Sequence, residues 1–247
     1  MILGVIPARY ASTRFPGKPL IDIRGKSMIQ RVYERVTLAQ RLDAVVVATD
    51  DERIASHVAD FGGRAVLTRV DHPSGTDRCQ EALQVVGGQY NYVINIQGDE
   101  PFIHPEQIDE LAAVLDGQVE LATQMITVTS QEQLFNSGEV KIVLNHQQDA
   151  LYFSREVIPH LRGIPKEEWH KRHTYWCHVG MYAYRSDVLQ QITQLPVSLL
   201  EKAESLEQLR WLEAGFRIRC VPTHYQSTCV DTPEDLANLL TNWPGND

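Results

Sequence analysis

The first half of the chain alternates short apolar runs with amphipathic runs, and this order restricts the possible folds more than any other feature. The predicted strands cover residues 2–6, 44–49, 64–68 and 92–97. Helices are predicted to begin near Ser27, Asp51 and Asp77, and another follows Pro105. Strand–helix alternation favours right-handed crossovers, so the pattern predicts an α/β fold with a mixed, mostly parallel sheet and helices on both faces.

The second half is less regular. Strands are predicted at residues 119–128, 140–144, 150–154, 179–184 and 217–222, with one helix over 199–214 and a last helix from Pro233. No repeat, low-complexity tract or linker divides the sequence. We therefore predict a single domain over residues 1–247, with a substrate-binding subregion at about 135–185.

Charge and cysteine content exclude several classes of function. The 247 residues carry a formal net charge of −9, which argues against nucleic acid as a partner. No apolar stretch reaches the length of a membrane span, and the short opening run is not a signal peptide. The four cysteines form no C-x-x-C pair, which is typical of reduced thiols in a cytoplasmic protein.

A basic loop follows the first predicted strand. It carries Arg9, Arg14 and Lys18, with a turn at residues 16–17. Ligands of open α/β sheets bind beyond the carboxyl ends of the strands, so these cations suit a polyphosphate. The run is not a Walker A loop, because Ser12 and Pro19 stand where that motif requires Gly and Ser or Thr. The alternative is an ordinary basic surface loop.

Two carboxylates are candidate ligands for a divalent cation. Asp99 follows the buried strand at residues 92–97, and Asp231 lies in the run VDTPED. Mg²⁺ is usually held by one or two carboxylates together with phosphate oxygens. The alternatives are local: Asp99 can satisfy its own turn, and Asp231 or Thr232 can cap a helix that has Pro233 in its first turn.

Further polar residues lie where strands end or helices begin. Ser74, Gly75 and Thr76 form a small-residue loop that can present N–H groups and hydroxyls to a base or ribose, or can simply cap a helix. Arg155 ends an aromatic-rich strand, where a guanidinium can bind a substrate carboxylate in bidentate fashion.

Two further pairs of polar residues are candidates for a substrate site. Strand alternation puts His178 and Tyr182 on one face. Glu207 and Gln208 lie on the predicted 199–214 helix and are possible partners of sugar hydroxyls, although charges on such a helix usually form a solvated face.

Together these runs resemble the 3-deoxy-manno-octulosonate (Kdo) cytidylyltransferase family over nearly the whole chain. The resemblance is carried by PARYASTRFPGKPL, TRVDHPSGTDR, NIQGDEP, VKIVL, ALYFSR with IPHLRG, HVGMYAYR, LEKAESLEQLR and VDTPEDL, in that order. One departure is Cys229, where the family usually has Gly shortly before Asp231.

The resemblance implies a Rossmann-like nucleotidyltransferase fold of the glycosyltransferase-A type and a homodimer. It implies CTP and Kdo as substrates, giving CMP-Kdo and pyrophosphate for lipopolysaccharide biosynthesis, and Mg²⁺ held by Asp99 and Asp231. Arg9 and Lys18 are implied as catalytic residues that contact the triphosphate. The implied nucleotide-binding residues are Pro7, Ala8, Arg9, Lys18, Arg69, Ser74, Gly75 and Thr76. The implied sugar-acid-binding residues are Gln97, Arg155, His178, Tyr182, Glu207 and Gln208.

Two other functions stay open. The chain can activate a related acid sugar, such as 8-amino-Kdo or a sialic acid, or it can be a nucleotide-binding regulatory module without catalysis. Retention of both Asp99 and Asp231 argues against the second. For assembly, aromatic residues are concentrated in the 135–185 subregion, which we expect to form the dimer interface. They are Tyr152, Phe153, Trp169, Tyr175, Trp176, Tyr182 and Tyr184.

Overall fold

The computed structural model describes residues 1–11, 15–226 and 228–243, which group into two compact units. Unit 1 comprises residues 1–113 and the C-terminal segment from Tyr225, and unit 2 comprises residues 114–224. The prediction of a single domain stays a prediction. Within the described ranges, none of the helices combines the length and the apolar character needed to cross a membrane.

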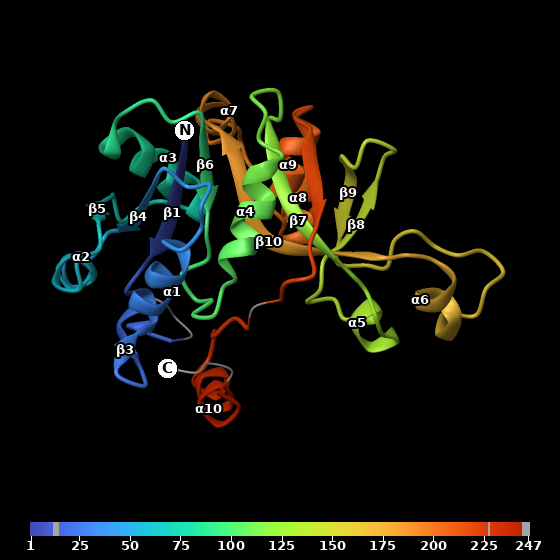
Figure 1. The fold of residues 1–247 in the computed structure, drawn as a ribbon. Coiled ribbons are helices and arrows are strands. Elements are labelled where there is room, and N and C mark those ends of the chain that lie inside the picture. Colours follow the sequence, from blue (N-terminus) through green and yellow to red (C-terminus); the bar gives the residue numbers. More distant parts are fainter. Residues whose placement is uncertain (12–14, 227, 244–247) are drawn as a thin grey trace. The chain divides into compact units, whose positions relative to one another are not determined.

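Unit 1 is built on four parallel strands. They are β1 (Ile2–Ala8), β4 (Ala44–Thr49), β5 (Ala65–Leu67) and β6 (Tyr92–Asn95). Their order is β6-β1-β4-β5, and Figure 1 shows them with β5 at the left and β6 at the right. The two central strands read as continuous apolar runs because both of their faces are covered.

Helices cover both faces of these strands. They are α1 (Met28–Val36), α2 (Glu52–Asp60), α3 (Gly75–Val86) and α4 (Pro105–Ala113). The chain moves from β1 through α1 and α2 out to β5, and α3 then returns it to β6. Right-handed crossovers in opposite directions place α3 on the other face from α1 and α2.

The first strand and the third helix differ slightly from the sequence prediction. The strand predicted over residues 2–6 continues through Pro7 to Ala8. Strand β6 pairs only with residues up to Val5, so the missing N–H of Pro7 costs no bond to β6. The helix predicted near Asp77 begins at Gly75, since the Ser74 side chain accepts the Asp77 N–H as an N-cap.

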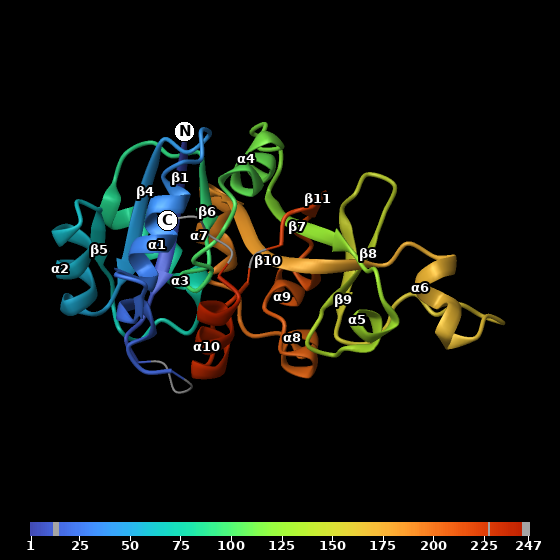
Figure 2. The same ribbon diagram turned by 60° about the horizontal axis from the view of Figure 1, so that its bottom comes forward.

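Unit 2 holds five strands: β7 (Leu121–Thr127), β8 (Lys141–Leu144), β9 (Ala150–Ser154), β10 (Trp176–Arg185) and β11 (Ile218–Pro222). Strand β7 lies between β11, which is parallel to it, and β10, which is antiparallel. Figure 2 shows β10 continuing to the β8–β9 hairpin, with the short α6 (Trp169–Arg172) beyond it. Parallel and antiparallel pairs together confirm the predicted mixed sheet.

The prediction of one helix over residues 199–214 is wrong. The segment forms α8 (Leu199–Glu204) and α9 (Gln208–Glu213), separated at Ser205, whose φ of 52° is left-handed. Arg155 explains the break: its Nε donates to the Glu204 carbonyl at 2.7 Å and its Nη2 to the Ser205 carbonyl at 3.4 Å. The carbonyls that would continue α8 are thus bound from outside. A bidentate ion pair from Arg210 to Glu201, at 2.7 and 2.6 Å, ties the two helices together.

Three helices of unit 2 were not predicted from the sequence. They are α5 (Gln131–Phe135), α6 and α7 (Ser186–Ile192). All are short, with five, four and seven residues, so their apolar periodicity is too brief to be distinguished from that of a strand or a loop.

Gly98 is held close to β1, and this contact fixes the turn after β6. A Cβ atom at Gly98 would lie 2.8 Å from the Pro7 carbonyl oxygen, closer than real Cβ atoms approach backbone. We predict that Gly98→Ala lowers the free energy of unfolding by about 1–3 kcal/mol, measured by urea denaturation, because backbone must move.

Gly75→Ala is the matched control. Its Cβ would meet the Asn95 Nδ2 at 3.4 Å, and Gly75 begins a helix, so we expect equal or slightly higher stability. Equal stability of the two variants would show that the approach of Gly98 to Pro7 does not constrain the turn.

Candidate active site

The centre of the candidate site is an ion-pair triad in unit 1. The Lys18 Nζ donates to Asp99 Oδ2 at 2.7 Å and to Asp231 Oδ1 at 2.9 Å. The three residues come from sequence positions far apart, and the structure brings them together as the sequence predicted for the two carboxylates. The Lys18 side chain is 15% exposed, so this cation is screened only partly by water.

Lys18 is placed by the turn before it. Gly17 adopts a left-handed φ of 73°, and its N–H donates to the Tyr10 carbonyl at 2.9 Å. A short 3₁₀ helix, Lys18–Leu20, follows at once. Only glycine adopts this conformation without strain, so the Pro16-Gly17 turn directs Lys18 back towards the end of β1. Arg14, the third cation of this loop, lies outside the described residues.

Asp231 is placed by the last helix, α10 (Pro233–Thr241). Val230 and Leu239 are buried with Ile23 and Met28, and this cluster fastens the C-terminal segment to the rest of unit 1. The Val230 N–H also donates to the Asp99 carbonyl at 2.9 Å. The two carboxylates are thus held by backbone contact between their own segments.

The helix cap of α10 is Thr232, not Asp231. The Thr232 hydroxyl accepts the Asp235 N–H at 3.2 Å, and the Asp235 carboxylate accepts the N–H groups of Asp231 and Thr232, forming a capping box. Capping of α10 is therefore not the main role of Asp231. Its carboxylate points instead at Lys18.

A cavity of about 430 Å³ opens on this triad. It is lined by Pro7, Ala8, Arg9, Ala11, Lys18, Pro19, Gln97, Gly98, Asp99 and Asp231. All of these residues lie at the carboxyl ends of β1 and β6 or in the segments that meet them, which is where ligands of open α/β sheets bind. Six predicted nucleotide- or metal-site residues and Gln97 therefore share one cavity.

The electrostatics of the triad favour a bound cation. Burial would lower the pKa of Lys18, but hydrogen bonds and charge from Asp99 and Asp231 outweigh it and raise the pKa. Carboxylate oxygens are the ligands that Mg²⁺ prefers, and here two of them converge on one positive charge. The residues present thus fit a divalent metal ion, with the Lys18 ammonium in the position of a stand-in cation.

The Ser74–Thr76 loop approaches the same end of β1. A Cβ atom at Gly75 would lie 3.8 Å from the Pro7 Cγ, so the start of α3 lies next to Pro7, which lines the cavity. Ser74 caps the helix and Thr76 is buried. Arg69 is exposed, and its Nε lies 3.4 Å from Asp71. Its side chain thus pairs locally in this structure.

Arg78 is a buried cation that the sequence analysis did not select. Its side chain is 1% exposed, and its Nη1 lies 2.5 Å from the Thr68 hydroxyl and 3.2 Å from Asp50 Oδ1. Burial lowers the pKa of Arg78. The charge of Asp50 opposes this effect, and the like charge of Arg9 adds to it. The available signal was an arginine directly after the predicted helix start at Asp77 and directly before Cys79, which the structure shows buried.

In unit 2, His178 and Tyr182 lie side by side as predicted. Their ring centroids are 5.1 Å apart, although β10 carries a bulge between Val179 and Tyr182. The bulge adds two residues, which preserves the alternation of faces. Burial lowers the pKa of His178 to about 4, so its imidazole is neutral at physiological pH. Its Nε2 lies 3.0 Å from the Thr123 hydroxyl.

The other predicted sugar-side residues of unit 2 have different surroundings. The Arg155 guanidinium contacts the backbone carbonyls of Ser137, Glu204 and Ser205. Gln208 is 5% exposed, and among the described residues its Nε2 has no hydrogen-bond partner. Glu207 directly precedes α9. A buried amide without a partner costs free energy, which favours a ligand contact for Gln208.

The fold and the cavity define a nucleotide-binding α/β protein, and comparison with known proteins gives its class. A family described as cytidylyltransferase matches residues 3–218. The chain is 54% identical to a 3-deoxy-manno-octulosonate cytidylyltransferase from Cytophaga hutchinsonii, over 96% of each sequence. A protein of the same name from Geobacter sulfurreducens is 46% identical, over 97% of this chain and 98% of that one.

A solved structure agrees with these sequences. It is described as CMP:2-keto-3-deoxy-manno-octonic acid synthetase complexed with CTP, and it matches with a TM-score of 0.90 and 44% identity, over 98% of this chain and 97% of that chain. The chain belongs to the family of 3-deoxy-manno-octulosonate cytidylyltransferases. The predicted Rossmann-like nucleotidyltransferase fold is confirmed.

The capping box yields a test of the separate roles of Asp231 and Thr232. We predict that Thr232→Ala lowers the free energy of unfolding by about 1 kcal/mol, because it removes an N-cap. Asp231→Asn should change stability less, since Asp231 caps nothing. Chemical denaturation of both variants provides the measurement. A larger loss in Asp231→Asn than in Thr232→Ala would contradict this separation.

Proposed function

We propose that this chain transfers CMP from CTP to the anomeric hydroxyl of Kdo, releasing pyrophosphate. The observation that carries the proposal is the convergence of Lys18, Asp99 and Asp231 on one cavity at the carboxyl edge of the parallel strands. The names of the relatives supply the nucleotide and the sugar acid. The metal, the individual site residues, the homodimer and the cytoplasmic location belong to the proposal.

Asp99 and Asp231 are proposed to hold Mg²⁺. When bound, the ion would neutralise charge on the reacting phosphate and lower the pKa of the attacking hydroxyl. The two carboxylates bind Lys18 in this structure, and Asp99 and Asp231 would hold the ion in place of the ammonium. Lys18, which lines the same cavity, would then be available to bind the triphosphate.

Arg9 and Lys18 are proposed to stabilise the departing pyrophosphate. Both line the cavity, and neither needs to form a covalent bond, because phosphoryl and nucleotidyl transfer depend mainly on positioning and charge neutralisation. Pro7, Ala8 and the Ser74–Thr76 loop are proposed to contact the nucleoside, with Arg69 beside them. Arg78 lies in the same helix as Thr76 and contacts Asp50 and Thr68.

The polar residues of unit 2 are proposed to contact the sugar acid. A neutral His178 can exchange a hydrogen bond with a hydroxyl, and the Gln208 amide can donate one. Arg155 binds a carboxylate only by giving up its weaker contacts. Its Nη1 and Nη2 bonds, at 3.2 and 3.4 Å, are longer than the Nε bond at 2.7 Å. Tyr182 and Glu207 complete the proposed set.

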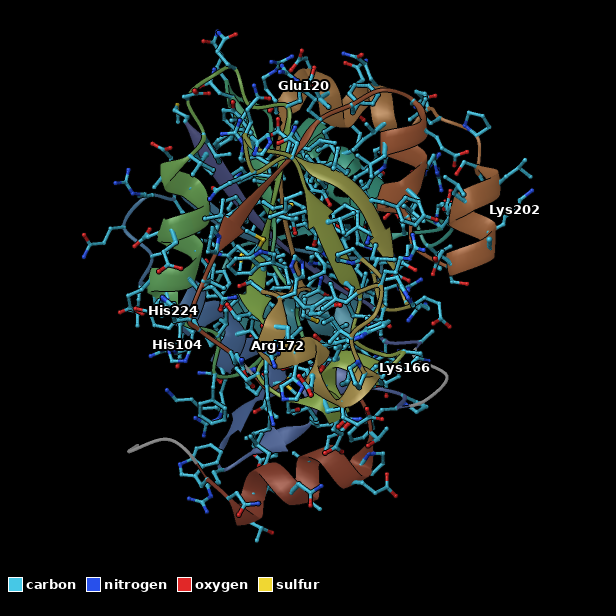
Figure 3. The ribbon with its side chains drawn as sticks, turned by 90° about the vertical axis from the view of Figure 1, so that its right-hand side faces the viewer. His104, Glu120, Lys166, Arg172, Lys202 and His224 are labelled. Atoms are coloured by element: carbon cyan, nitrogen blue, oxygen red, sulfur yellow. The ribbon has the colours of Figure 1, made fainter. Side chains whose placement is uncertain are left out.

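The activity itself is the first test. Purified protein with CTP, Kdo and Mg²⁺ should release pyrophosphate, while ATP and GTP should substitute poorly. Asp99→Asn and Asp231→Asn should each lower kcat on the order of 10²-fold or more, because each removes a charge that the metal requires. The control is Lys202→Ala, which alters an exposed cation on α8, labelled in Figure 3.

The outcomes separate the alternatives. If kcat/KM is higher with 8-amino-Kdo or a sialic acid than with Kdo, that sugar is the substrate and the reaction type stays the same. Binding of CTP without turnover of any sugar acid would indicate a regulatory module. Equal use of all nucleotides would contradict the proposed cytidine specificity.

The aromatic residues expected at the interface of the proposed homodimer are mostly buried. Phe153, Tyr175 and Tyr184 are buried inside unit 2, as are Trp169 and Tyr182, so these aromatic residues do not form an exposed patch. Other apolar residues of the same subregion are exposed instead: Leu151 is 60% exposed, Phe135 38% and Ile164 37%. Single exposed residues are common, and so the dimer rests mainly on the family resemblance.

Light scattering tests the assembly. We predict a mass of about twice the 28.0 kDa of one chain at micromolar concentration. Leu151→Glu should weaken the dimer, because it places a charge on the most exposed of the three apolar residues. A mass of one chain for the unmodified protein would refute the dimer, and a dimer insensitive to Leu151→Glu would move the interface elsewhere.

A further inference from the structure

A third side chain with metal-binding chemistry lies beside the two carboxylates. The Sγ of Cys229 and one carboxylate oxygen from each of Asp99 and Asp231 all lie within 4.8 Å of one another. Cys229 is exposed, whereas Cys79, Cys177 and Cys220 are buried. Among the described residues, this is the single group of three or more potential metal ligands.

Sulfur changes the choice of metal at this site. Mg²⁺ is held by oxygen and does not select thiolate ligands. Zn²⁺ and other soft divalent cations bind thiolate and carboxylate together, typically with three protein ligands and one open position. We propose that Cys229, Asp99 and Asp231 form a binding site for a thiophilic divalent cation of the zinc or cadmium class, which competes with Mg²⁺.

The position of Lys18 is independent support for a cation at this point. Its ammonium lies 2.7 Å from Asp99 and 2.9 Å from Asp231, so the carboxylates already bind a positive charge. A divalent cation would replace the ammonium and add the sulfur as a third ligand. Two carboxylates and a thiolate with one divalent ion leave a net charge of −1, which the nearby Lys18 can balance.

The ligands are held in place before any metal binds. The hydrogen bond from the Val230 N–H to the Asp99 carbonyl joins the segment of Cys229 to that of Asp99. The capping box at Thr232 fixes the backbone that follows Asp231. Preorganisation of this kind reduces the entropy lost on binding. Formation of the metal–sulfur bond releases the thiol proton to solvent, and no oxidation or reduction occurs.

Occupation by the soft cation also has a consequence for activity. If the proposed function holds, a cation bound through Cys229 occupies the carboxylates that Mg²⁺ requires, and it should inhibit nucleotidyl transfer. The inhibition rests on the proposed function, whereas the binding of the cation does not.

Cadmium is the probe for binding, because Cd²⁺–thiolate coordination produces an ultraviolet charge-transfer band. The reduced full-length chain is titrated with Cd²⁺ without nucleotide, and affinity is measured by calorimetry. We expect one ion per chain and a thiolate band. Cys229→Ser should abolish the band and weaken binding roughly tenfold or more, because a hydroxyl is a poor ligand for this cation. The control is Cys220→Ala, which removes a buried thiol and should keep the band.

The variants give two ways to overturn the proposal. Undiminished affinity in Cys229→Ser would show that sulfur is not a ligand, and loss of the band in Cys220→Ala would place the ligand elsewhere. Asp99→Asn tests the carboxylate: it should weaken Cd²⁺ binding while retaining a thiolate band. If Asp99→Asn binds Cd²⁺ with unchanged affinity, the Asp99 carboxylate is not a ligand, and the proposal is refuted.

A competition experiment separates this inference from the proposed function. Zn²⁺ is added at fixed Mg²⁺, CTP and Kdo, and the concentration that halves each protein's own Mg²⁺-supported rate is compared. We expect Cys229→Ser to require roughly tenfold more Zn²⁺ than the unmodified chain. Turnover without a thiolate band refutes the site and retains the function. A thiolate band without turnover refutes the function and retains the site.

Discussion

The contact between the Lys18 ammonium and the carboxylates of Asp99 and Asp231 is the interaction on which the rest of the site depends. Without a cation, two carboxylates converging at the edge of the sheet would repel each other. With Lys18 between them, at 2.7 and 2.9 Å, they can be held close together in the ligand-free protein. The chain thus holds the two proposed metal ligands together with its own positive charge, and that charge lies in the cavity proposed to hold the triphosphate.

The fold explains how residues so distant in sequence meet. Parallel strands bring the ends of β1 and β6 to one edge, which places the Lys18 loop near the turn of Asp99. Gly98 allows that turn to approach the Pro7 carbonyl, and burial of Val230 and Leu239 brings Asp231 to the same point. Each carboxylate is positioned by backbone contacts and packing, so its side chain is available for a cation.

The sequence predicted what depends on local pattern and missed what depends on distant partners. Strand–helix alternation was enough to predict the parallel strands of unit 1, and the motifs taken together were enough to predict the family. The break at Ser205 could not be predicted, because its cause is Arg155, 50 residues earlier in the chain. Arg78 looked like an ordinary helix residue, since only folding shows it buried against Thr68 and Asp50. Periodicity likewise placed His178 beside Tyr182, but the burial that keeps its imidazole neutral is a tertiary effect.

Charge balance would give the proposed cation a second role beyond coordination. The chain carries a net charge of −9, and the cavity contains two carboxylates, so a polyphosphate would be repelled by both the molecule and its site. Lys18 and Arg9 offset part of this repulsion locally. A divalent cation held by Asp99 and Asp231, as proposed, would offset more of it and would leave Lys18 available to the phosphates. Metal and nucleotide should therefore each strengthen the binding of the other, because each reduces the like-charge repulsion that opposes its partner.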